Sequence, residues 1–289
     1  MTTETLLAPT GDTQATLWNG RAGCAWIDAQ SVLDAMLQPF ETLLVDAVAA
    51  ASATRVLDVG CGTGSTTLAI ARRLAADGCS VGIDISAPMV EAARIRAARE
   101  DSAARFIRAD AQAYAFEPAG FDLVVSRFGV MFFDDPPLAF ANLRRAARDD
   151  ARLWFVAWRS AADNPFMTAA ERAAAPLLPT LPPRRPDVPG QFAFADPQRV
   201  QEILEQGGWS EVDIRPIDVE CTLPERDLLQ YMSRLGPVGL LLQEANACTR
   251  ERVLARVRAA FDPYVHGDEV RFTAACWMVG ARAAGGGRG

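Results

Sequence analysis

Residues 56–64 read Val56-Leu57-Asp58-Val59-Gly60-Cys61-Gly62-Thr63-Gly64, and in this run three glycines join a strand pattern to a helix pattern. Residues 55–59 predict a short buried strand, and the spacing of apolar residues within 68–74 predicts a helix. Glycine has no Cβ and tolerates positive φ, so a turn of this kind lets a ligand approach the backbone. The glycines alone fit two interpretations: a nucleotide-type cofactor site, or a tight connection that binds nothing.

The spacing of the glycines narrows the kind of nucleotide that could bind. Dinucleotide-binding turns use G-x-G-x-x-G, whereas here the glycines are Gly60, Gly62 and Gly64 and the next residue is Ser65. A phosphate loop of the G-x-x-x-x-G-K-[ST] type needs a lysine, and all 29 basic residues of this chain are arginine. The pattern therefore disfavours NAD, FAD and ATP-dependent phosphoryl transfer.

Strand and helix patterns alternate along most of the chain. Such alternation predicts parallel βαβ units in a doubly wound, Rossmann-like α/β fold. We expect a mostly parallel sheet of seven strands, at residues 55–59, 80–85, 105–110, 121–126, 153–158, 212–223 and 269–283.

Ligands of doubly wound sheets bind beyond the carboxyl ends of the strands. Asp58, Asp84, Asp110 and Ser126 all lie at or near the predicted strand ends. These four residues are therefore candidates for a cofactor site.

The segments outside this core predict a cover for the site. Residues 1–51 are expected to form an N-terminal helical segment over it, in which residues 1–24 are polar and irregular and residues 25–51 form an amphipathic helix. Pro39 should kink or split that helix. The sheet core is expected at residues 52–223 and 265–283, with a helical cap inserted at 224–264, a proline-rich connection at 159–196 and a flexible tail at 284–289.

Composition excludes several classes of partner. The net charge of −7 argues against a nucleic-acid partner, which usually meets a basic surface. No apolar run approaches the roughly 20 residues that span a membrane, and the first residues lack a secretion signal, so we expect a soluble, cytoplasmic protein. The six cysteines are scattered without a CxxC pair and His266 is the single histidine, which argues against a metal site. A small-molecule substrate is the expected partner.

Several segments together resemble the class I S-adenosylmethionine-dependent methyltransferases. The resemblance is to the small-molecule branch, the type 11-like enzymes of ubiquinone and menaquinone biosynthesis. It is carried by VLDVGCGTG at 56–64, VGIDISAPMVEAAR at 81–94, FIRADAQAYAF at 106–116 and FDLVVSRFGVMFFDDP at 121–136. Many relatives carry a Pro-Gly-Gly turn where this chain has Arg148-Asp149-Asp150-Ala151, a departure away from the expected site.

This resemblance implies a site for S-adenosyl-L-methionine. Asp58, Gly60, Gly62 and Gly64 would hold the amino-acid part of the cofactor. Asp84 would accept hydrogen bonds from both ribose hydroxyls, a task that suits a carboxylate because it offers two acceptor oxygens.

The resemblance also implies contacts with the adenine and the methionine ammonium. Ile85 and Met89 would sandwich the adenine, although both could equally be core residues. Asp110 would bind the exocyclic amino group or simply cap a turn. The Ala111 backbone would reach a ring nitrogen, and the Ser126 carbonyl would lie near the ammonium.

The implied substrate side is less defined. Trp18 would close the cofactor site, or only pack the N-terminus onto the core. Phe128 and Met131 would border the substrate, with Phe132, Phe133 and Trp158 in an apolar wall. Arg127 would orient an anionic substrate, or pair with Asp134 or Asp135.

The function implied is methyl transfer to an O, N or C atom of a small apolar or aromatic metabolite. Such a transfer is an in-line displacement that depends on alignment and exclusion of water. His266 fits a loop histidine, and no catalytic residue is assigned. The alternatives are a cyclase or rearrangement enzyme that uses the cofactor without net methyl transfer, a noncatalytic binding protein, and an NAD-dependent oxidoreductase.

Overall fold

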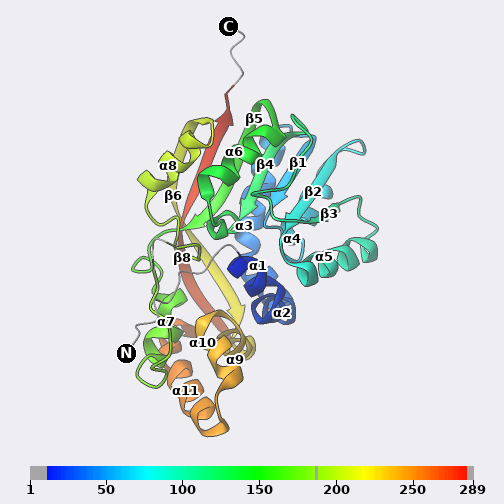
Figure 1. The fold of residues 1–289 in the computed structure, drawn as a ribbon. Helices are drawn as coiled ribbons and strands as arrows, with labels where there is room; N and C mark the ends of the chain where they lie inside the picture. The colour runs from blue at the N-terminus through cyan, green and yellow to red at the C-terminus, as the bar shows by residue number, and fades with distance from the viewer. Residues whose placement is uncertain (1–11, 186–187, 285–289) are drawn as a thin grey trace.

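The computed structural model describes residues 12–185 and 188–284, and a single mixed β-sheet forms its centre (Figure 1). Five strands run parallel in the order β3-β2-β1-β4-β5, followed by β8 and β6 in antiparallel pairing. Their bounds are β1 Arg55–Val59, β2 Cys79–Asp84, β3 Arg105–Arg108, β4 Phe121–Arg127, β5 Ala147–Trp158, β6 Trp209–Pro224 and β8 Glu269–Ala283.

These seven strands confirm the predicted doubly wound, mostly parallel sheet. The described residues add β7, Val265–His266, which pairs only with β8 and is too short to leave a pattern in the sequence. β3 ends at Arg108, so Asp110 lies in the loop beyond it. β6 begins at Trp209, earlier than the predicted start at residue 212.

Helices cover both faces of the sheet, as Figure 1 shows. On one face lie α3, Gln30–Ala50, and α4, Ser65–Ala71, with α5, Ala87–Arg99, packed on β2 and β3. On the other face lie α6, Pro136–Ala146, and α8, Pro197–Gln206. The central strands are buried on both faces, which explains their continuous apolar sequences.

The N-terminal segment differs from its prediction. Residues 12–24 are not irregular: they contain α1, Asp12–Asn19, and the start of α2, Arg21–Asp28, while residues 1–11 lie outside the described part. Helices of eight residues are marginal in isolation, so tertiary contacts must stabilise them, and local sequence does not reveal those. The predicted helix over 25–51 breaks at Ala29, whereas Pro39 lies inside a continuous α3.

The segment 224–264, which we call the cap, is mostly helical, and its role over the site stays a prediction. It contains α9, Glu225–Arg234, α10, Gly236–Glu244, α11, Ala247–Ala260, and the 3-10 turn η2, Asp262–Tyr264. The proline-rich connection adds a helix that the prediction missed, α7, Pro165–Ala174, which lies with the cap at one end of the molecule (Figure 1). Its signal was Pro165, because proline is favoured at the first helical position.

The described residues lack two kinds of structural feature. They contain no helix that is both long and apolar enough to cross a membrane. Nor do they contain a group of three or more histidine, cysteine or acidic side chains suited to a metal ion. Residues 285–289 of the predicted tail lie outside the described part.

Candidate active site

The glycine turn lies between β1 and α4. Gly60, Gly62 and Gly64 have φ values of 68°, 53° and 85°, in the left-handed region that favours glycine. A Cβ on Gly60 would lie 2.6 Å from the Cα atom of Gly129, so this position brings the turn against the loop after β4. A Cβ on Gly62 would meet only the sulfur of Met89, at 3.9 Å, which leaves room for a ligand.

One cavity of about 790 Å³ opens from this turn, within the size range of small-molecule sites. It runs past the ends of β2 and β4 to the cap and brings together residues that are far apart in sequence. Most of the predicted site residues line it: Trp18, Gly60, Gly62, Asp84, Ile85, Met89, Asp110, Ala111, Arg127, Phe128 and Met131.

Asp84 is buried at the end of β2, where backbone groups hold its carboxylate. Its Oδ2 accepts a hydrogen bond of 2.8 Å from Gly62 N–H, and its Oδ1 accepts one of 2.8 Å from Ser86 N–H. Burial raises the pKa of Asp84, although these N–H groups act in the opposite direction. Each oxygen keeps a second acceptor site, so the carboxylate can also bind a ligand.

The loops after β2 and β3 carry the other residues predicted to meet adenine. Met89 is buried, whereas Ile85 and Asp110 are partly exposed to the cavity. Asp110 also accepts a hydrogen bond of 2.9 Å from Gln112 N–H, which is the turn contact of the alternative interpretation. The Ala111 carbonyl accepts one of 2.8 Å from the Asn142 side chain.

A narrow recess of about 40 Å³ adjoins the cavity beneath the glycine turn. It is lined by Asp34, Asp58, Thr66 and Arg127, among others, and shares Arg127 and two of the glycines with the cavity. Thr66 Oγ1 is buried without a hydrogen-bond partner among the described residues. A buried orphan hydroxyl costs roughly 1–3 kcal/mol, so the recess suits a ligand with polar groups.

The recess places one cation among several carboxylates. Asp58 accepts a hydrogen bond of 2.6 Å from Thr67 Oγ1, and burial raises its pKa to about 6 against the effects of Thr67 and Arg127. Burial lowers the pKa of Arg127, while the charges of Asp34, Glu41 and Asp58 raise it. Arg127 is therefore held in an acidic setting.

Arg127 does not pair with either of its alternative partners, Asp134 and Asp135. No ion pair joins Arg127 to Asp134 or Asp135 in the part of the chain that the structure describes, and its Nη1 lies 3.4 Å from the Leu37 carbonyl oxygen. Its place in the recess makes it a neighbour of Asp58 rather than of the loop before α6.

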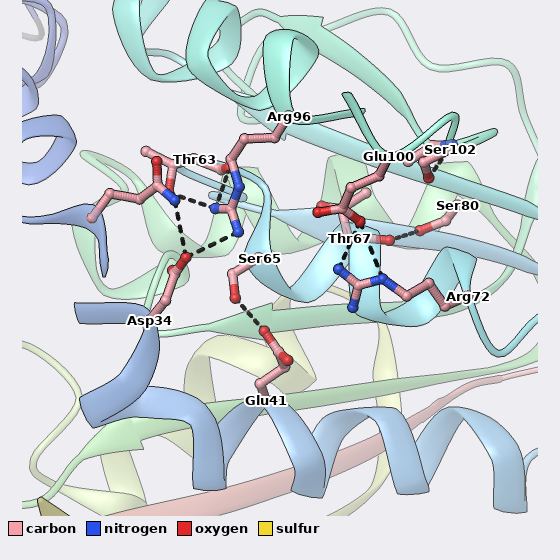
Figure 2. Close-up of polar contacts among 12 residues, drawn as sticks. Asp34, Glu41, Thr63, Ser65, Thr67, Arg72, Ser80, Arg96, Glu100 and Ser102 are labelled. Atoms are coloured by element: carbon pink, nitrogen blue, oxygen red, sulfur yellow. Dashed lines mark hydrogen bonds and ion pairs between the residues drawn. The ribbon is translucent and has the colours of Figure 1, made fainter. Parts of the chain in front are cut away.

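Helix α3 is tied to the glycine turn by polar contacts (Figure 2). Arg96 of α5 pairs with Asp34 at 2.9 Å and donates a hydrogen bond of 2.9 Å to the Thr63 carbonyl. Ser65 donates a hydrogen bond to Glu41. The N-terminal segment is thus anchored to the site, and Asp34 enters the recess.

Helix α1 is anchored in a similar way, through the loop after β2. The Asn19 amide donates a hydrogen bond of 3.1 Å to the Ile85 carbonyl and accepts one of 2.8 Å from Ala87 N–H. Ser86 Oγ donates one of 2.6 Å to the Trp18 carbonyl. The Trp18 ring then lines the cavity, edge-on to Phe132 with ring centroids 5.1 Å apart. Trp18 therefore both packs the N-terminus and borders the site.

Two predicted residues lie outside both the cavity and the recess. Gly64 directly precedes α4, and a Cβ there would lie 2.8 Å from the ring of Phe106, so this position allows close packing. Ser126 is buried and its Oγ donates a hydrogen bond of 2.7 Å to the Val59 carbonyl while accepting one of 3.1 Å from Gly129 N–H. Ser126 therefore shapes the loop on which Phe128 lies.

Phe128 and Trp158 form the aromatic wall of the cavity. Their rings stack at 4.6 Å with an interplanar angle of 11°. Phe128 has a φ of 65°, which is unusual for a bulky residue and is typical of functional sites. Met131 is buried beside them and also lines the cavity.

Comparison with known proteins identifies the family. Residues 56–150 match a family described as a methyltransferase domain. The chain is 32% identical over 216 residues to aklanonic acid methyltransferase DauC from Streptomyces sp. (strain C5), which covers 73% of this chain and 86% of that protein. The chain belongs to the S-adenosylmethionine-dependent methyltransferases.

A second relative agrees with this methyltransferase assignment, and a solved structure shares the fold. Nocamycin O-methyltransferase from Saccharothrix syringae is 29% identical over 201 residues, 66% of this chain and 72% of that protein. Among solved structures, the [4+2]-cyclase SpnF superposes with a TM-score of 0.52 and 20% identity, over 84% of this chain and 80% of that one. At that identity, the likeness to SpnF shows a shared fold.

S-adenosylmethionine is the cofactor of this methyltransferase, and the donor set of the recess fits its amino-acid end. Carboxylates at Asp34 and Asp58 suit an ammonium, the Arg127 guanidinium suits a carboxylate, and Thr66 Oγ1 lacks a partner that a ligand could supply.

Sequence reasoning missed Asp34, Thr63 and Thr66 in this methyltransferase. Thr63 and Thr66 flank the last glycine of the turn, and their proximity to it was the available signal. Asp34 left none, because a polar residue on an amphipathic helix resembles an ordinary solvated position.

Proposed function

We propose that this methyltransferase transfers a methyl group to an O, N or C atom of a small, mainly apolar or aromatic metabolite. The observation that carries the proposal is a continuous cavity with a polar, carboxylate-bearing end at Asp84 and Asp110 and an aromatic wall at Phe128 and Trp158. Relatives named for methylation of nocamycin and of aklanonic acid support a small-molecule acceptor. A nucleic-acid partner is not expected, because the chain has a net charge of −7.

The nucleoside end of the cofactor is assigned to the loops after β2 and β3. Asp84 would bind the ribose hydroxyls, because backbone N–H groups already orient both of its oxygens. Ile85 and Met89 would contact the adenine, and Asp110 and Ala111 would meet its polar edge. Trp18 would cover this end of the cavity.

The methionine end is assigned to the recess. The ammonium would lie near Asp58 and Asp34, and Thr66 Oγ1 would gain its missing partner. In its acidic setting, Arg127 would pair with the methionine carboxylate, because a guanidinium binds a carboxylate through two parallel hydrogen bonds. This role replaces substrate orientation as the leading assignment for Arg127, while Phe128 and Met131 stay assigned to the substrate.

Bound S-adenosylmethionine supplies an electrophilic methyl group on its sulfonium. The residues of the chain then position the acceptor: Phe128, Met131 and Trp158 form an apolar surface that excludes water and limits the acceptor's orientation. None of these three side chains can accept a proton, so they act through alignment and the exclusion of water. His266 lies in β7 rather than on the cavity wall.

Calorimetry with S-adenosylhomocysteine tests the cofactor assignment through Asp84→Ala. We expect at least a tenfold loss of affinity, because charge-assisted hydrogen bonds to the ribose are removed. Asp46→Ala is the matched control, since Asp46 is exposed on α3 away from the cavity. Undiminished affinity of Asp84→Ala would refute the site.

The second candidate is a cyclase or rearrangement enzyme that binds S-adenosylmethionine without transferring its methyl group. The fold that this chain shares with the cyclase SpnF is the reason for retaining this candidate. Incubation of the protein with methyl-labelled S-adenosylmethionine and a cell extract, followed by mass spectrometry, separates the two. A labelled product heavier by one methylene unit supports transfer. A converted product without label supports the cyclase.

A further inference from the structure

The cap end of the cavity contains polar groups that the methyl-transfer chemistry does not use. Helix α7 directs Met167, Ala170 and Glu171 to the cavity, at the spacing of one helix face. Arg184, in the connection after α7, and Tyr231 of α9 line the same end. An apolar acceptor alone would need none of these polar side chains.

Glu171 and Arg184 form a close ion pair there. Arg184 Nε and Nη2 donate hydrogen bonds of 2.7 Å and 2.5 Å to the two oxygens of Glu171, and Nη2 also lies 3.2 Å from Gln191 Oε1. The Arg184 guanidinium lies 4.6 Å from the centre of the Phe192 ring. The Glu171 side chain is 16% exposed and the Arg184 side chain 30%, so the pair is partly shielded from water. The two opposite charges of the pair cancel.

Tyr231 supplies a hydrogen-bond donor beside this pair. Burial raises the pKa of its phenol, so the group stays protonated, and Arg184 and Glu171 are close enough to influence it. Its hydroxyl lies 3.5 Å from the Met167 sulfur, a weak acceptor. The ring packs against Phe166 at 5.7 Å, which fixes the direction of the hydroxyl. A ligand oxygen would be a better partner than the thioether.

We propose that the cap end of the cavity binds an uncharged oxygen group, a hydroxyl or a carbonyl, on the part of the acceptor far from the transferred methyl group. The inference rests on the proposed function and adds a substrate class to it: an elongated apolar molecule with a neutral polar end. Tyr231 donates to the ligand oxygen, and Glu171 accepts from a ligand hydroxyl.

The same geometry disfavours an anionic end on the acceptor. The Glu171 carboxylate already accepts hydrogen bonds from both Nε and Nη2 of Arg184, and its charge repels a second carboxylate. An anion moved from water to this ion pair would lose hydration while the Arg184 guanidinium stays bound to Glu171. Arg234, which also lines the cavity, is paired with Asp28 at 3.1 Å.

Calorimetry with three rigid probes tests the proposal in the full chain saturated with S-adenosylhomocysteine. The probes are biphenyl, 4-phenylphenol and biphenyl-4-carboxylate, which share a framework and differ in the end group. We expect 4-phenylphenol to bind roughly three- to tenfold more tightly than biphenyl, as one neutral hydrogen bond provides. We expect biphenyl-4-carboxylate to bind more weakly than 4-phenylphenol.

Two variants separate recognition from a purely structural role. Tyr231→Phe should reduce the preference for 4-phenylphenol over biphenyl, because only the hydrogen bond to Glu171 is left, and should leave the affinity for S-adenosylhomocysteine unchanged. Glu171→Gln should strengthen binding of biphenyl-4-carboxylate roughly tenfold, because it removes a repelling charge and frees the Arg184 fork. If the Glu171–Arg184 pair only held α7 against the connection, Glu171→Gln would instead weaken binding of all three probes. Tyr264→Phe is the control, since Tyr264 packs 5.1 Å from Phe166 but does not line the cavity.

The outcomes distinguish this inference from the proposed function. Failure of the unmodified protein to bind S-adenosylhomocysteine would overturn the cofactor site itself. Normal cofactor binding with no preference for 4-phenylphenol, including no binding of any probe up to its solubility, would overturn the cap-end inference alone. An unchanged preference in Tyr231→Phe would do the same.

Discussion

The two ends of the cavity are built from different interactions. At the glycine turn, backbone N–H groups and positive-φ glycines hold Asp84 in one orientation. At the cap, aromatic side chains such as Phe166 and Tyr231 pack together and only a few polar groups interrupt them. The first end depends on the identity of single residues, whereas apolar packing tolerates exchange when volume is conserved. This difference is expected of related enzymes that bind the same cofactor but act on different substrates.

The largest effect should come from Gly60→Ala at the glycine turn. The new Cβ would lie 2.6 Å from the Gly129 backbone at a φ of 68°, so both the turn and the loop after β4 must move. We expect at least a hundredfold loss of affinity for S-adenosylhomocysteine, measured by calorimetry, and a fall in the unfolding free energy of more than about 2 kcal/mol.

Gly267→Ala provides a matched control for that substitution. Gly267 has a φ of 70°, but a Cβ there would meet nothing within 4 Å. It should lose only about 1–2 kcal/mol, the cost of a left-handed residue, and keep cofactor affinity. Equal effects of the two substitutions would show that φ alone, and not the close approach to Gly129, limits position 60.

The next effect is a pH dependence of cofactor binding through Asp58. Burial raises its pKa to about 6, so the side chain becomes protonated as the pH falls below that value. A protonated acid cannot pair with the methionine ammonium, and affinity for S-adenosylhomocysteine should fall roughly tenfold at pH 5. Calorimetry from pH 5 to 8 on the unmodified protein and on Asp58→Asn checks this. A decline of the same size in the variant would assign the titration to another group.

The stability of the free protein should change with pH in the opposite sense. The folded-state pKa of Asp58 lies above the value of about 3.9 expected in the unfolded chain, so the folded state binds the proton more tightly. The contribution of Asp58 to the unfolding free energy is therefore fully present below about pH 4 and is lost as the pH rises through about 6. Comparison of denaturant unfolding with that of Asp58→Asn at pH 4 and pH 7 isolates this contribution.

A smaller effect, of opposite sign for stability and binding, is expected at Thr66. Thr66→Val keeps the shape but removes the buried hydroxyl that lacks a partner. The unfolding free energy should rise by about 1 kcal/mol, whereas affinity for S-adenosylhomocysteine should fall roughly fivefold because the ligand loses a hydrogen bond. Thr67→Val should instead destabilise the protein, since Thr67 donates to Asp58 at 2.6 Å. Loss of stability in Thr66→Val would point to a partner for that hydroxyl.

Sequence patterns predict the cofactor end better than the rest of the molecule, for a physical reason. Alternating strands and helices place Asp84 and Asp110 at one edge of a parallel sheet, and the glycines mark the turn between β1 and α4 at the same edge. The resemblance to known methyltransferases adds Ile85, Met89 and the other roles, which stay predictions until ligand binding is measured.

The parts that were not predicted depend on contacts distant in sequence. Asp34 reaches the recess because Arg96 of α5 holds it there, and α1 is anchored by Asn19 at the loop after β2. Gly64 and the Ser126 side chain also make contacts that the sequence does not report, with Phe106 and the Val59 carbonyl, whereas the cofactor contacts expected of Gly64 and of the Ser126 carbonyl stay predictions. Local patterns describe one element at a time and do not report which side chains meet.

The smallest effect should come from a conservative exchange at the cap end. Met232 is buried and lines the cavity, and Met232→Leu conserves its volume. We expect the unfolding free energy to fall by less than about 1.5 kcal/mol and the affinity for S-adenosylhomocysteine to stay within twofold, measured by thermal unfolding and calorimetry. Met89→Leu, an identical exchange at the cofactor end, should weaken cofactor binding more, because Met89 lies against Gly62. Equal effects at the two positions would mean that both ends tolerate exchange alike, and the division between a fixed cofactor end and an adaptable substrate end would not hold.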